Sequence, residues 1–250
     1  MKIALLSNVN ADYVLRIISK ELDCVASVGY GDVWGQLLNP SSELQCANPD
    51  AIVFLMDIEQ LIDGCTGEES IRNAIDDWYS IFDTVNNPGK DYYISDVSFR
   101  SSVLTDNDSL SEFSIIQYWM ESLEKRIKDH INIHWLRVNE AINKIGRANA
   151  FSDKMWYMGK IPYTNEGCKV ISEVISETVS LQNRTPKKVL VLDLDNTLWG
   201  GILGELGVEG IELSDDHVGA IYKKVQQQIK AIKETGILIA IVSKNNETDV

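Results

Sequence analysis

Short apolar runs alternate along the chain with longer segments whose apolar residues recur every three or four positions. The runs at 2–6, 24–28, 51–56, 92–97 and 131–138 predict β-strands. The periodic segments predict helices at 10–21, around 71–85, from 109 onward and at 164–181. Strands that alternate with helices are typical of a doubly wound parallel sheet. We therefore expect an α/β fold for this region.

All four of these helices have a predicted inner face, which in 10–21 is Val14, Ile17 and Ile18. In 71–85 the apolar residues recur at intervals of four, three, four and three, at Ile71, Ile75, Trp78, Phe82 and Val85. Ser109 and Glu112 have the spacing of a capping box. The helix that they open has Phe113, Ile116, Met120, Leu123 and Ile127 on its predicted inner face. In the helix 164–181 the inward positions are predicted to be Val170, Val174 and Thr178 or Val179.

A polar segment at 182–186 lacks periodicity and contains a proline, so it predicts a boundary between domains 1–183 and 187–250. The second region has apolar strands at 189–192 and 237–242. Between them lies a helix from Ser214, whose predicted inner face is Val218, Ile221, Val225, Ile229 and Ile232. Two strands and one helix are too few to cover a parallel sheet on both faces. Either the chain is part of a longer protein, which we favour, or these strands pair onto the first domain's sheet.

Composition narrows the class of protein. The formal net charge of −14 argues against a nucleic-acid surface, which is usually basic. The four cysteines are dispersed, which fits a reducing compartment better than a disulfide framework. The chain starts without the pattern of a signal peptide, and no apolar run approaches the ~20 residues of a membrane span. We expect a cytoplasmic protein with no nucleic-acid or membrane partner.

Two carboxylates follow the strand 189–192. Asp193 and Asp195 are two residues apart, and side chains at that spacing share a face of a strand. Ligands of open α/β sheets bind beyond the carboxyl ends of the strands. Two neighbouring carboxylates repel each other unless a cation joins them. The pattern therefore indicates a magnesium site that handles phosphate. A receiver-type phosphoacceptor is less favoured, because its acidic pair and its acceptor normally lie on different strands.

The residues around these aspartates resemble a known family. The stretch VLDLDNTLWGGILGELGVEGI, followed by an apolar strand that ends in SKNN, is similar to the haloacid-dehalogenase (HAD) superfamily, and specifically to the FkbH-like branch of subfamily IIIC. The first domain resembles the FkbH-like N-terminal region, which is similar to SGNH hydrolases. The resemblance implies an SGNH- or flavodoxin-like domain followed by an incomplete, capless, Rossmann-like HAD domain.

The resemblance also implies roles for individual residues. Asp193 would be the nucleophile and Asp195 the general acid and base, and both would hold Mg²⁺, Asp195 through its backbone carbonyl. Ser243 would hydrogen-bond the phosphoryl group, with Thr197, Lys244 and Asn245 as further candidates for phosphate binding. For Lys244 and Asn245, a plain loop position is favoured over a catalytic role. The superfamily's lysine and second acidic pair come from later strands, so the chain would carry half of the catalytic site.

Three hypotheses for function follow. The first is a Mg²⁺-dependent phosphatase or phosphotransferase that acts on a phosphorylated small molecule through an aspartyl-phosphate. The second is implied by the best-known FkbH-like branch, which loads a glyceryl unit from 1,3-bisphosphoglycerate onto an acyl carrier protein. The third is a non-catalytic protein that binds a carrier protein or partner enzyme and keeps a relic HAD segment.

An esterase function of the first domain is disfavoured. Ser7 follows the first strand, where SGNH relatives place their nucleophile. The position of their DxxH motif matches Asp153-Lys154-Met155-Trp156, so a tryptophan replaces the activating histidine. A serine without a base is a weak nucleophile. We therefore expect a structural role for Ser7.

Overall fold

The computed structural model describes residues 1–24, 30–100, 111–182 and 187–245. The chain forms two compact units, Met1–Asn183 and Arg184–Val250, and each is considered by itself. Within the described ranges, no helix has the length and apolar character that crossing a membrane requires.

The first unit is built on a five-stranded parallel sheet in the order β2-β1-β3-β4-β5. Its strands are β1 (Lys2–Ser7), β2 (Asp23–Cys24), β3 (Ala51–Leu55), β4 (Asp91–Ser95) and β5 (Ile133–Leu136). This strand order is that of flavodoxin-like doubly wound folds, which confirms the α/β prediction. The end of the predicted strand 24–28 lies outside the described residues. The predicted strand 131–138 was too long, because Ile131 is 99% exposed and precedes β5.

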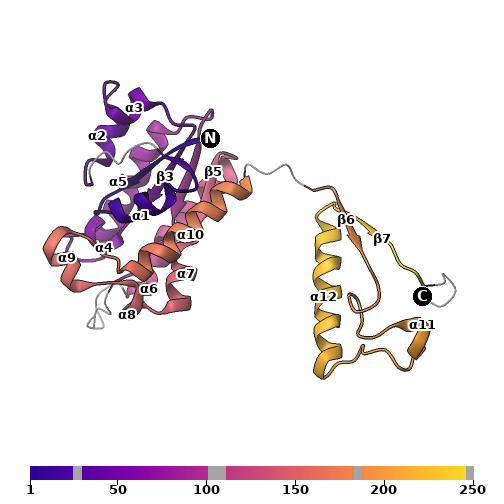
Figure 1. Cartoon of the computed structure of the whole chain (residues 1–250). Coiled ribbons are helices and arrows are strands. Elements are labelled where there is room, and N and C mark those ends of the chain that lie inside the picture. The colour runs from indigo at the N-terminus through magenta and orange to yellow at the C-terminus, as the bar shows by residue number, and fades with distance from the viewer. Residues whose placement is uncertain (25–29, 101–110, 183–186, 246–250) are drawn as a thin grey trace. The chain divides into compact units, whose positions relative to one another are not determined.

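Helices cover both faces of this sheet, and each face has its own hydrophobic core. Figure 1 shows α1 and α10 side by side, and the contacts between these two helices agree. That face carries α1 (Asp12–Ile18), α7 (Val138–Ile145), α8 (Arg147–Ala150) and α10 (Asn165–Gln182). The opposite face carries α2 (Val33–Leu38), α3 (Glu43–Ala47), α4 (Ile58–Leu61), α5 (Glu68–Val85) and α6 (Glu112–Asp129). The short helix α9 (Asp153–Gly159) buries no residue.

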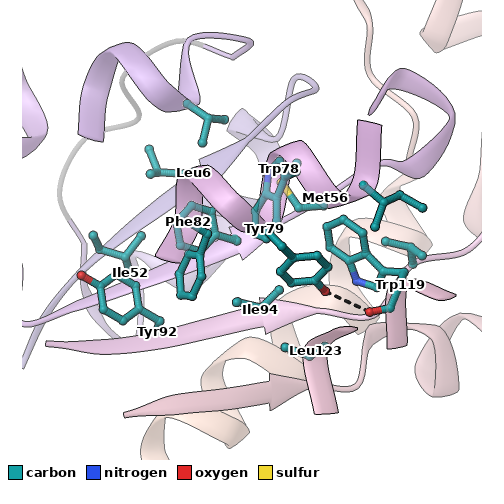
Figure 2. Close-up of a cluster of buried hydrophobic side chains, with 14 of the residues drawn as sticks. Leu6, Ile52, Met56, Trp78, Tyr79, Phe82, Tyr92, Ile94, Trp119 and Leu123 are labelled. Carbon is teal, nitrogen blue, oxygen red and sulfur yellow. Dashed lines mark hydrogen bonds between the residues drawn. The ribbon is translucent and has the colours of Figure 1, made fainter. Parts of the chain in front are cut away.

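Helix α5 contributes central residues to the core on the face that carries α2 to α6. Ile75, Trp78 and Phe82 are buried, and Ile71 and Val85 pack against them partly buried, so the predicted face is confirmed. Tyr79 is also buried, and its hydroxyl donates a hydrogen bond to the carbonyl of Trp119 at 3.0 Å (Figure 2). This bond ties α5 to α6 inside the apolar layer.

The predicted inner face of α6 was partly wrong. Phe113 is 73% exposed, whereas the buried row is Ile115, Trp119 and Leu123. The other predicted residues, Ile116, Met120 and Ile127, lie partly buried beside that row. A helix with two adjacent apolar rows satisfies the same spacing twice, so periodicity alone does not choose between them. The expected cap Ser109 lies outside the described residues, and Ser111 caps the helix by accepting a hydrogen bond from the Ser114 amide at 3.2 Å.

Helix α10 is rotated in the same way. Val179, one of the two predicted alternatives, is buried together with Ile171 and Ile175, while the predicted Val170 and Val174 lie at the margin and are only half-buried. Gly167 is buried against the carbonyl group of Ala150, where a side chain would not fit. The backbone of α8 therefore comes close to the first turn of α10.

The second unit contains two parallel strands, β6 (Val189–Leu192) and β7 (Leu238–Ile241), which form a sheet of their own. They do not extend the five-stranded sheet, so that alternative is not observed. The unit also contains α11 (Leu203–Leu206) and the crossover helix α12 (His217–Glu234). Strand, helix and parallel strand make the basic Rossmann-like βαβ unit.

The predicted burial of α12 was wrong for most of its inner face. Val225 and Ile229 are half-buried, but Val218, Ile221 and Ile232 are exposed. A sheet of two strands is narrower than the apolar face of a helix of 18 residues, so it covers only the middle row. Part of the apolar surface of this βαβ unit thus stays open in the described residues.

Candidate functional site

The loop after β6 is a tight turn anchored on one buried residue. Leu194 is 2% exposed, and its carbonyl accepts hydrogen bonds from the amides of Thr197 at 3.1 Å and Leu198 at 2.8 Å. Asn196 has a left-handed φ of 53°, and its Oδ1 accepts from the Gly201 amide at 2.9 Å. These bonds close the turn directly beyond the carboxyl end of β6, where Asp193 and Asp195 are placed.

One oxygen of Asp195 is held by three donors. Oδ1 accepts hydrogen bonds from the Leu203 amide at 3.0 Å, the Trp199 indole Nε1 at 3.0 Å and the Asn245 side-chain Nδ2 at 3.1 Å. The Leu203 amide is the largest cause that lowers the pKa of Asp195 below its ordinary value, and Asn245 and Trp199 act in the same direction. Asp195 is therefore a carboxylate at neutral pH, with Oδ2 left free of hydrogen bonds from the described residues.

Asp193 is the more accessible of the two carboxylates. Its side chain is exposed, and Oδ1 accepts a hydrogen bond from the Leu194 amide at 2.8 Å. No lysine, arginine or histidine forms an ion pair with it within the described ranges. An exposed and unpaired carboxylate can act as a nucleophile or bind a cation.

A cavity of 510 Å³ joins the ends of the two strands. Its lining includes Asp193 and Asp195 after β6, and Ser243 and Lys244 after β7. The structure thus brings together four of the six residues singled out from the sequence. A fifth, Asn245, joins them through its bond to Asp195, and its amide donates to Ser243 Oγ at 3.1 Å. Thr197 does not line the cavity, and its part in phosphate binding stays a prediction.

Two supporting contacts were not predicted. The Leu203 amide reaches Asp195 from the start of α11, and a backbone group carries no signal in a sequence. Gln226 donates from α12 to the Leu198 carbonyl at 2.7 Å and so fixes the turn against the helix. Gln226 is the first of three consecutive glutamines, and the sequence does not show which of them contacts the turn.

The oxygen atoms at this site fit a magnesium ion in part. No group of three or more histidine, cysteine, aspartate or glutamate side chains gathers among the residues that the structure describes. Magnesium does not need such a group, because it commonly binds one or two carboxylates and completes its shell with water and substrate phosphate. Asp193 keeps one carboxylate oxygen without a hydrogen bond from the described residues. It can therefore supply the single carboxylate ligand with which a protein often holds Mg²⁺.

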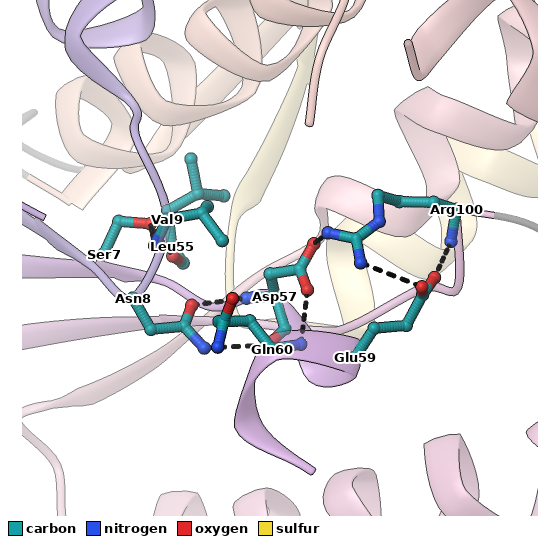
Figure 3. Close-up of polar contacts among 8 residues, drawn as sticks. All are labelled: Ser7, Asn8, Val9, Leu55, Asp57, Glu59, Gln60 and Arg100. Carbon is teal, nitrogen blue, oxygen red and sulfur yellow. Dashed lines mark hydrogen bonds and ion pairs between the residues drawn. The ribbon is translucent and has the colours of Figure 1, made fainter. Parts of the chain in front are cut away.

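Ser7 of the first unit is engaged by the backbone. It is 7% exposed, and its Oγ donates to the Leu55 carbonyl at 2.7 Å and accepts from the Val9 amide at 3.2 Å (Figure 3). Trp156, at the position of the SGNH histidine, stacks under the Arg100 guanidinium, whose carbon is 3.6 Å from the ring centre. The two hydrogen bonds of Ser7 to the backbone support a structural role for this residue.

A buried ion network lies at the same edge of the sheet. The guanidinium of Arg100 donates to Asp57 Oδ2 at 2.9 Å and to Glu59 Oε2 at 2.9 Å (Figure 3). Asp57 also caps α4 by accepting from the Gln60 amide at 2.8 Å. Burial raises the pKa of Asp57 to about 6, against the opposing effect of Arg100. The network holds the segment after β3 in place, and Asp57, Glu59 and Arg100 each have a partner of opposite charge.

The chain thus joins a doubly wound α/β unit to a βαβ unit with paired carboxylates at a strand end. One solved structure is similar in fold along the whole chain: the N-terminal part of the protein BF1531 from Bacteroides fragilis, which contains a phosphatase domain and is complexed with Mg. The two are 22% identical with a TM-score of 0.81, over 100% of this chain and 70% of that one. At this identity the match shows a common fold.

Two further structures align with about three quarters of the chain and have low scores. One is LAE5, an α/β hydrolase enzyme from the metagenome of Lake Arreo, with 12% identity, a TM-score of 0.45 and coverage of 73% of this chain and 96% of that one. The other is a putative acylhydrolase, BF3764, from Bacteroides fragilis NCTC 9343, with 10% identity, a TM-score of 0.46 and coverage of 73% and 88%. No protein-family model and no curated protein matches the chain.

Proposed function

We propose that the second unit is the nucleophile-bearing part of a Mg²⁺-dependent phosphatase or phosphotransferase of the HAD type, FkbH-like in its motif. The observation that carries this proposal is the single cavity that holds Asp193, Asp195, Ser243 and Lys244. Two carboxylates of different accessibility, a hydroxyl and an ammonium group at the ends of two parallel strands match the needs of phosphoryl transfer.

Asp193 is the proposed nucleophile. One of its carboxylate oxygens attacks the phosphorus atom, a new O–P bond forms, and the bond from phosphorus to the leaving oxygen breaks. Because Asp193 is exposed and has no cationic partner among the described residues, its lone pairs are available for this attack. A covalent aspartyl-phosphate splits one difficult displacement into two easier ones.

Asp195 is the proposed acid and base. In the first step the leaving oxygen takes a proton from Asp195. In the second step Asp195 takes a proton from the water that attacks phosphorus, which releases phosphate and restores Asp193. The lowered pKa of Asp195 favours its carboxylate form, so it is better prepared for the second step than for the first. Substrates with good leaving groups, which need no proton, should therefore react best.

Magnesium would be held by the Asp193 carboxylate and the Asp195 backbone carbonyl. When bound, it supplies positive charge that reduces repulsion between carboxylate and phosphate. Ser243 and Lys244 would bind the phosphoryl oxygens, and Lys244 adds a positive charge to a strongly acidic chain. The structural relative from Bacteroides fragilis, which contains a phosphatase domain and is complexed with Mg, supports this choice of metal.

The proposed substrate is a phosphorylated small molecule. The cavity volume of 510 Å³ lies within the range of roughly 300–1,000 Å³ that is usual for small-molecule sites. Its lining combines polar groups with the apolar side chains of Val191, Leu192 and Val242, so it could contact both a phosphate and a short carbon chain.

Phosphate release from an aryl phosphate by the full-length protein with Mg²⁺ tests the proposal. We expect Asp193→Asn to lower the rate by roughly two orders of magnitude or more, because an amide is a poor nucleophile. Asp215→Asn is the matched control, since Asp215 is an exposed aspartate of the same unit that pairs with Lys223. Equal rates for wild type and Asp193→Asn, or no release by either protein, would contradict the proposal.

A further inference from the structure

Trp199 lies in the loop after β6, and the residues on both sides of it are tied to other segments. The Leu198 carbonyl accepts a hydrogen bond from the Gln226 side chain of α12 at 2.7 Å. Gly200 is buried and exchanges two backbone hydrogen bonds with Glu212, at 3.1 and 2.8 Å. The backbone of Trp199 is therefore held from two directions by parts of the second unit that come later in the chain.

The half-buried side chain of Trp199 has one polar atom, and that atom contacts Asp195. The indole Nε1 donates to Asp195 Oδ1 at 3.0 Å. An indole N–H donates but does not accept, and a hydrogen bond to an ionised acceptor is roughly twice as strong as one between neutral groups. Trp199 does not belong to the described residues that line the cavity. It therefore acts on the site through Asp195 and not through contact with the substrate.

The donors to Asp195 Oδ1 differ in how firmly they are held. The Leu203 amide is a backbone group at the start of α11. The Asn245 side chain comes from the segment after β7, where its own amide makes a local bond to Ser243 Oγ at 3.1 Å. Trp199 combines a rigid ring with a backbone segment that is anchored on both sides. Of the two side-chain donors, Trp199 is thus the more firmly placed.

The two oxygens of Asp195 have different roles as a result. Oδ1 accepts three hydrogen bonds, whereas Oδ2 accepts none from the described residues. Oδ2 is therefore the oxygen that can take a proton from water. Such a transfer requires the two heavy atoms to come within about 2.6–3.2 Å of each other. Rotation of the carboxylate would turn Oδ2 away from the water, and the bond from Trp199 opposes that rotation.

We propose that Trp199 is a positioning residue for the second step of phosphoryl transfer, because its indole N–H holds Asp195 Oδ1. This inference rests on the proposed function of the second unit. In that step the water oxygen bonds to phosphorus, a water proton moves to Asp195 Oδ2, and the bond between phosphorus and the Asp193 oxygen breaks. Phosphate leaves, Asp193 is again a carboxylate, and Asp195 returns its proton to solvent. With a good leaving group the first step needs no proton, so it does not depend on Trp199.

Rapid-quench kinetics of the full-length protein with Mg²⁺ and p-nitrophenyl phosphate separate the two steps. Site-specific incorporation of a benzothiophene in place of the Trp199 indole keeps the shape of the ring and removes the N–H. We expect the aspartyl-phosphate to form at the wild-type rate and to release phosphate roughly 5- to 20-fold more slowly, because one of three hydrogen bonds to a charged group is lost. The value of kcat then falls, while kcat/KM, which reports the first step, stays unchanged. A loss of folded protein would lower both.

Trp199→Phe is the second variant and removes the same donor with an ordinary residue. Trp34→Phe is the matched control, since Trp34 is a half-buried tryptophan of the first unit, and both of its rates should equal those of the wild type. NMR measures the contact without any activity. The indole N–H resonance of Trp199, assigned by its absence from Trp199→Phe, should move in Asp195→Ala, and those of the other five tryptophans should not.

Three results would overturn the inference. The benzothiophene protein could release phosphate from Asp193 as fast as the wild type, formation and release could slow by the same factor, or the Trp199 resonance could stay in place in Asp195→Ala. Failure of the proposed function gives a different result, in which the wild type forms no aspartyl-phosphate although the Trp199 resonance still moves. That result also overturns the inference, because it leaves Trp199 without a step to serve.

Discussion

At the scale of single residues, the two aspartates differ in what surrounds them. Asp193 is exposed and accepts one hydrogen bond, whereas Oδ1 of Asp195 accepts three. The difference assigns the accessible carboxylate to attack and the restrained one to proton transfer. It also makes the protonation of Asp195 depend on donors that mutation can remove one at a time.

Asn245→Ala removes the donor that comes from the segment after β7. We expect the pKa of Asp195 to rise toward its ordinary value, because a hydrogen bond to the charged form lowers a carboxyl pKa. The Leu203 amide, which is the larger cause, remains, so the rise should be partial. A carbon-detected NMR titration of the carboxyl group measures it, with Gln228→Ala on the exposed side of α12 as control. A pKa that stays the same in Asn245→Ala would contradict this role.

The residues at the cavity could be predicted only in part. Ligands bind beyond the carboxyl ends of parallel strands, so Asp193 and Asp195 were expected at that edge, and the resemblance to the HAD superfamily added Ser243. Two of the three hydrogen bonds that hold Asp195 come from residues 8 and 50 positions later in the chain. Such contacts depend on how loops close, and local spacing does not encode that geometry. The sequence also could not show that the buried Trp78 Nε1–H lacks a hydrogen-bond partner among the described residues, because it does not tell which groups a core tryptophan contacts.

At the scale of elements, the spacing of apolar residues predicted which segments are helices and which are strands. It did not predict which face of each helix turns toward the sheet. The inner face of α5 was predicted correctly because its apolar residues form one row. In α6 two apolar rows lie side by side, and the sheet selects the row with Ile115 and Trp119 over Phe113. The choice depends on which row reaches the core, and that is a tertiary property.

The loop after β6 contains a glycine, Gly200, at a position where a side chain would not fit. Gly200 is buried and exchanges backbone hydrogen bonds with Glu212 at 3.1 and 2.8 Å. A Cβ at this position would lie 2.9 Å from the Glu212 Cβ and 3.0 Å from the Tyr222 ring, so the loop or α12 would have to shift.

Gly200→Ala should therefore destabilise the second unit by about 1–3 kcal/mol and lower phosphate release, because overpacking moves the turn that holds Asp195. Gly204→Ala is the matched control, since a Cβ there meets nothing within 4 Å. Denaturant unfolding and the aryl phosphate assay measure the two effects. Equal stability of the two variants would show that Gly200 is not needed for this packing.

At the scale of the whole molecule, each unit has its own chemistry. The first unit has a hydrophobic core on each face of its sheet and also buries carboxyl groups at one edge of that sheet. Asp96 follows β4, is 8% exposed, and accepts a hydrogen bond from the Asn139 amide at 2.7 Å. Burial raises its pKa from 3.8 to about 6, with that hydrogen bond opposing the rise.

The folded first unit should therefore lose stability through Asp96 as pH rises. A pKa that folding raises means that the folded state binds more protons than the unfolded state between about pH 4 and 6. This contribution is fully present below pH 4 and is lost as pH rises through 6. We expect Asp96→Asn to be more stable than wild type at pH 7 by about 2–3 kcal/mol and equally stable at pH 4.

Unfolding curves from tryptophan fluorescence at pH 4 and pH 7 measure this difference, because five of the six tryptophans belong to the first unit. Asp63→Asn serves as control, since Asp63 is exposed. An Asp96→Asn protein that is less stable than wild type at pH 7 would show that the charged form of Asp96 is the stabilising one.

The most direct test of the central claim is to locate the phosphoryl group during turnover. The full-length protein is mixed with Mg²⁺ and an aryl phosphate, quenched in acid, digested and analysed by mass spectrometry. We predict a phosphoryl group on Asp193 in the wild type, more of it in Asp195→Asn because the second step lacks its base, and none in Asp193→Asn. Labelling of another residue, equal labelling of Asp193→Asn, or no label in any of the three proteins would contradict the account.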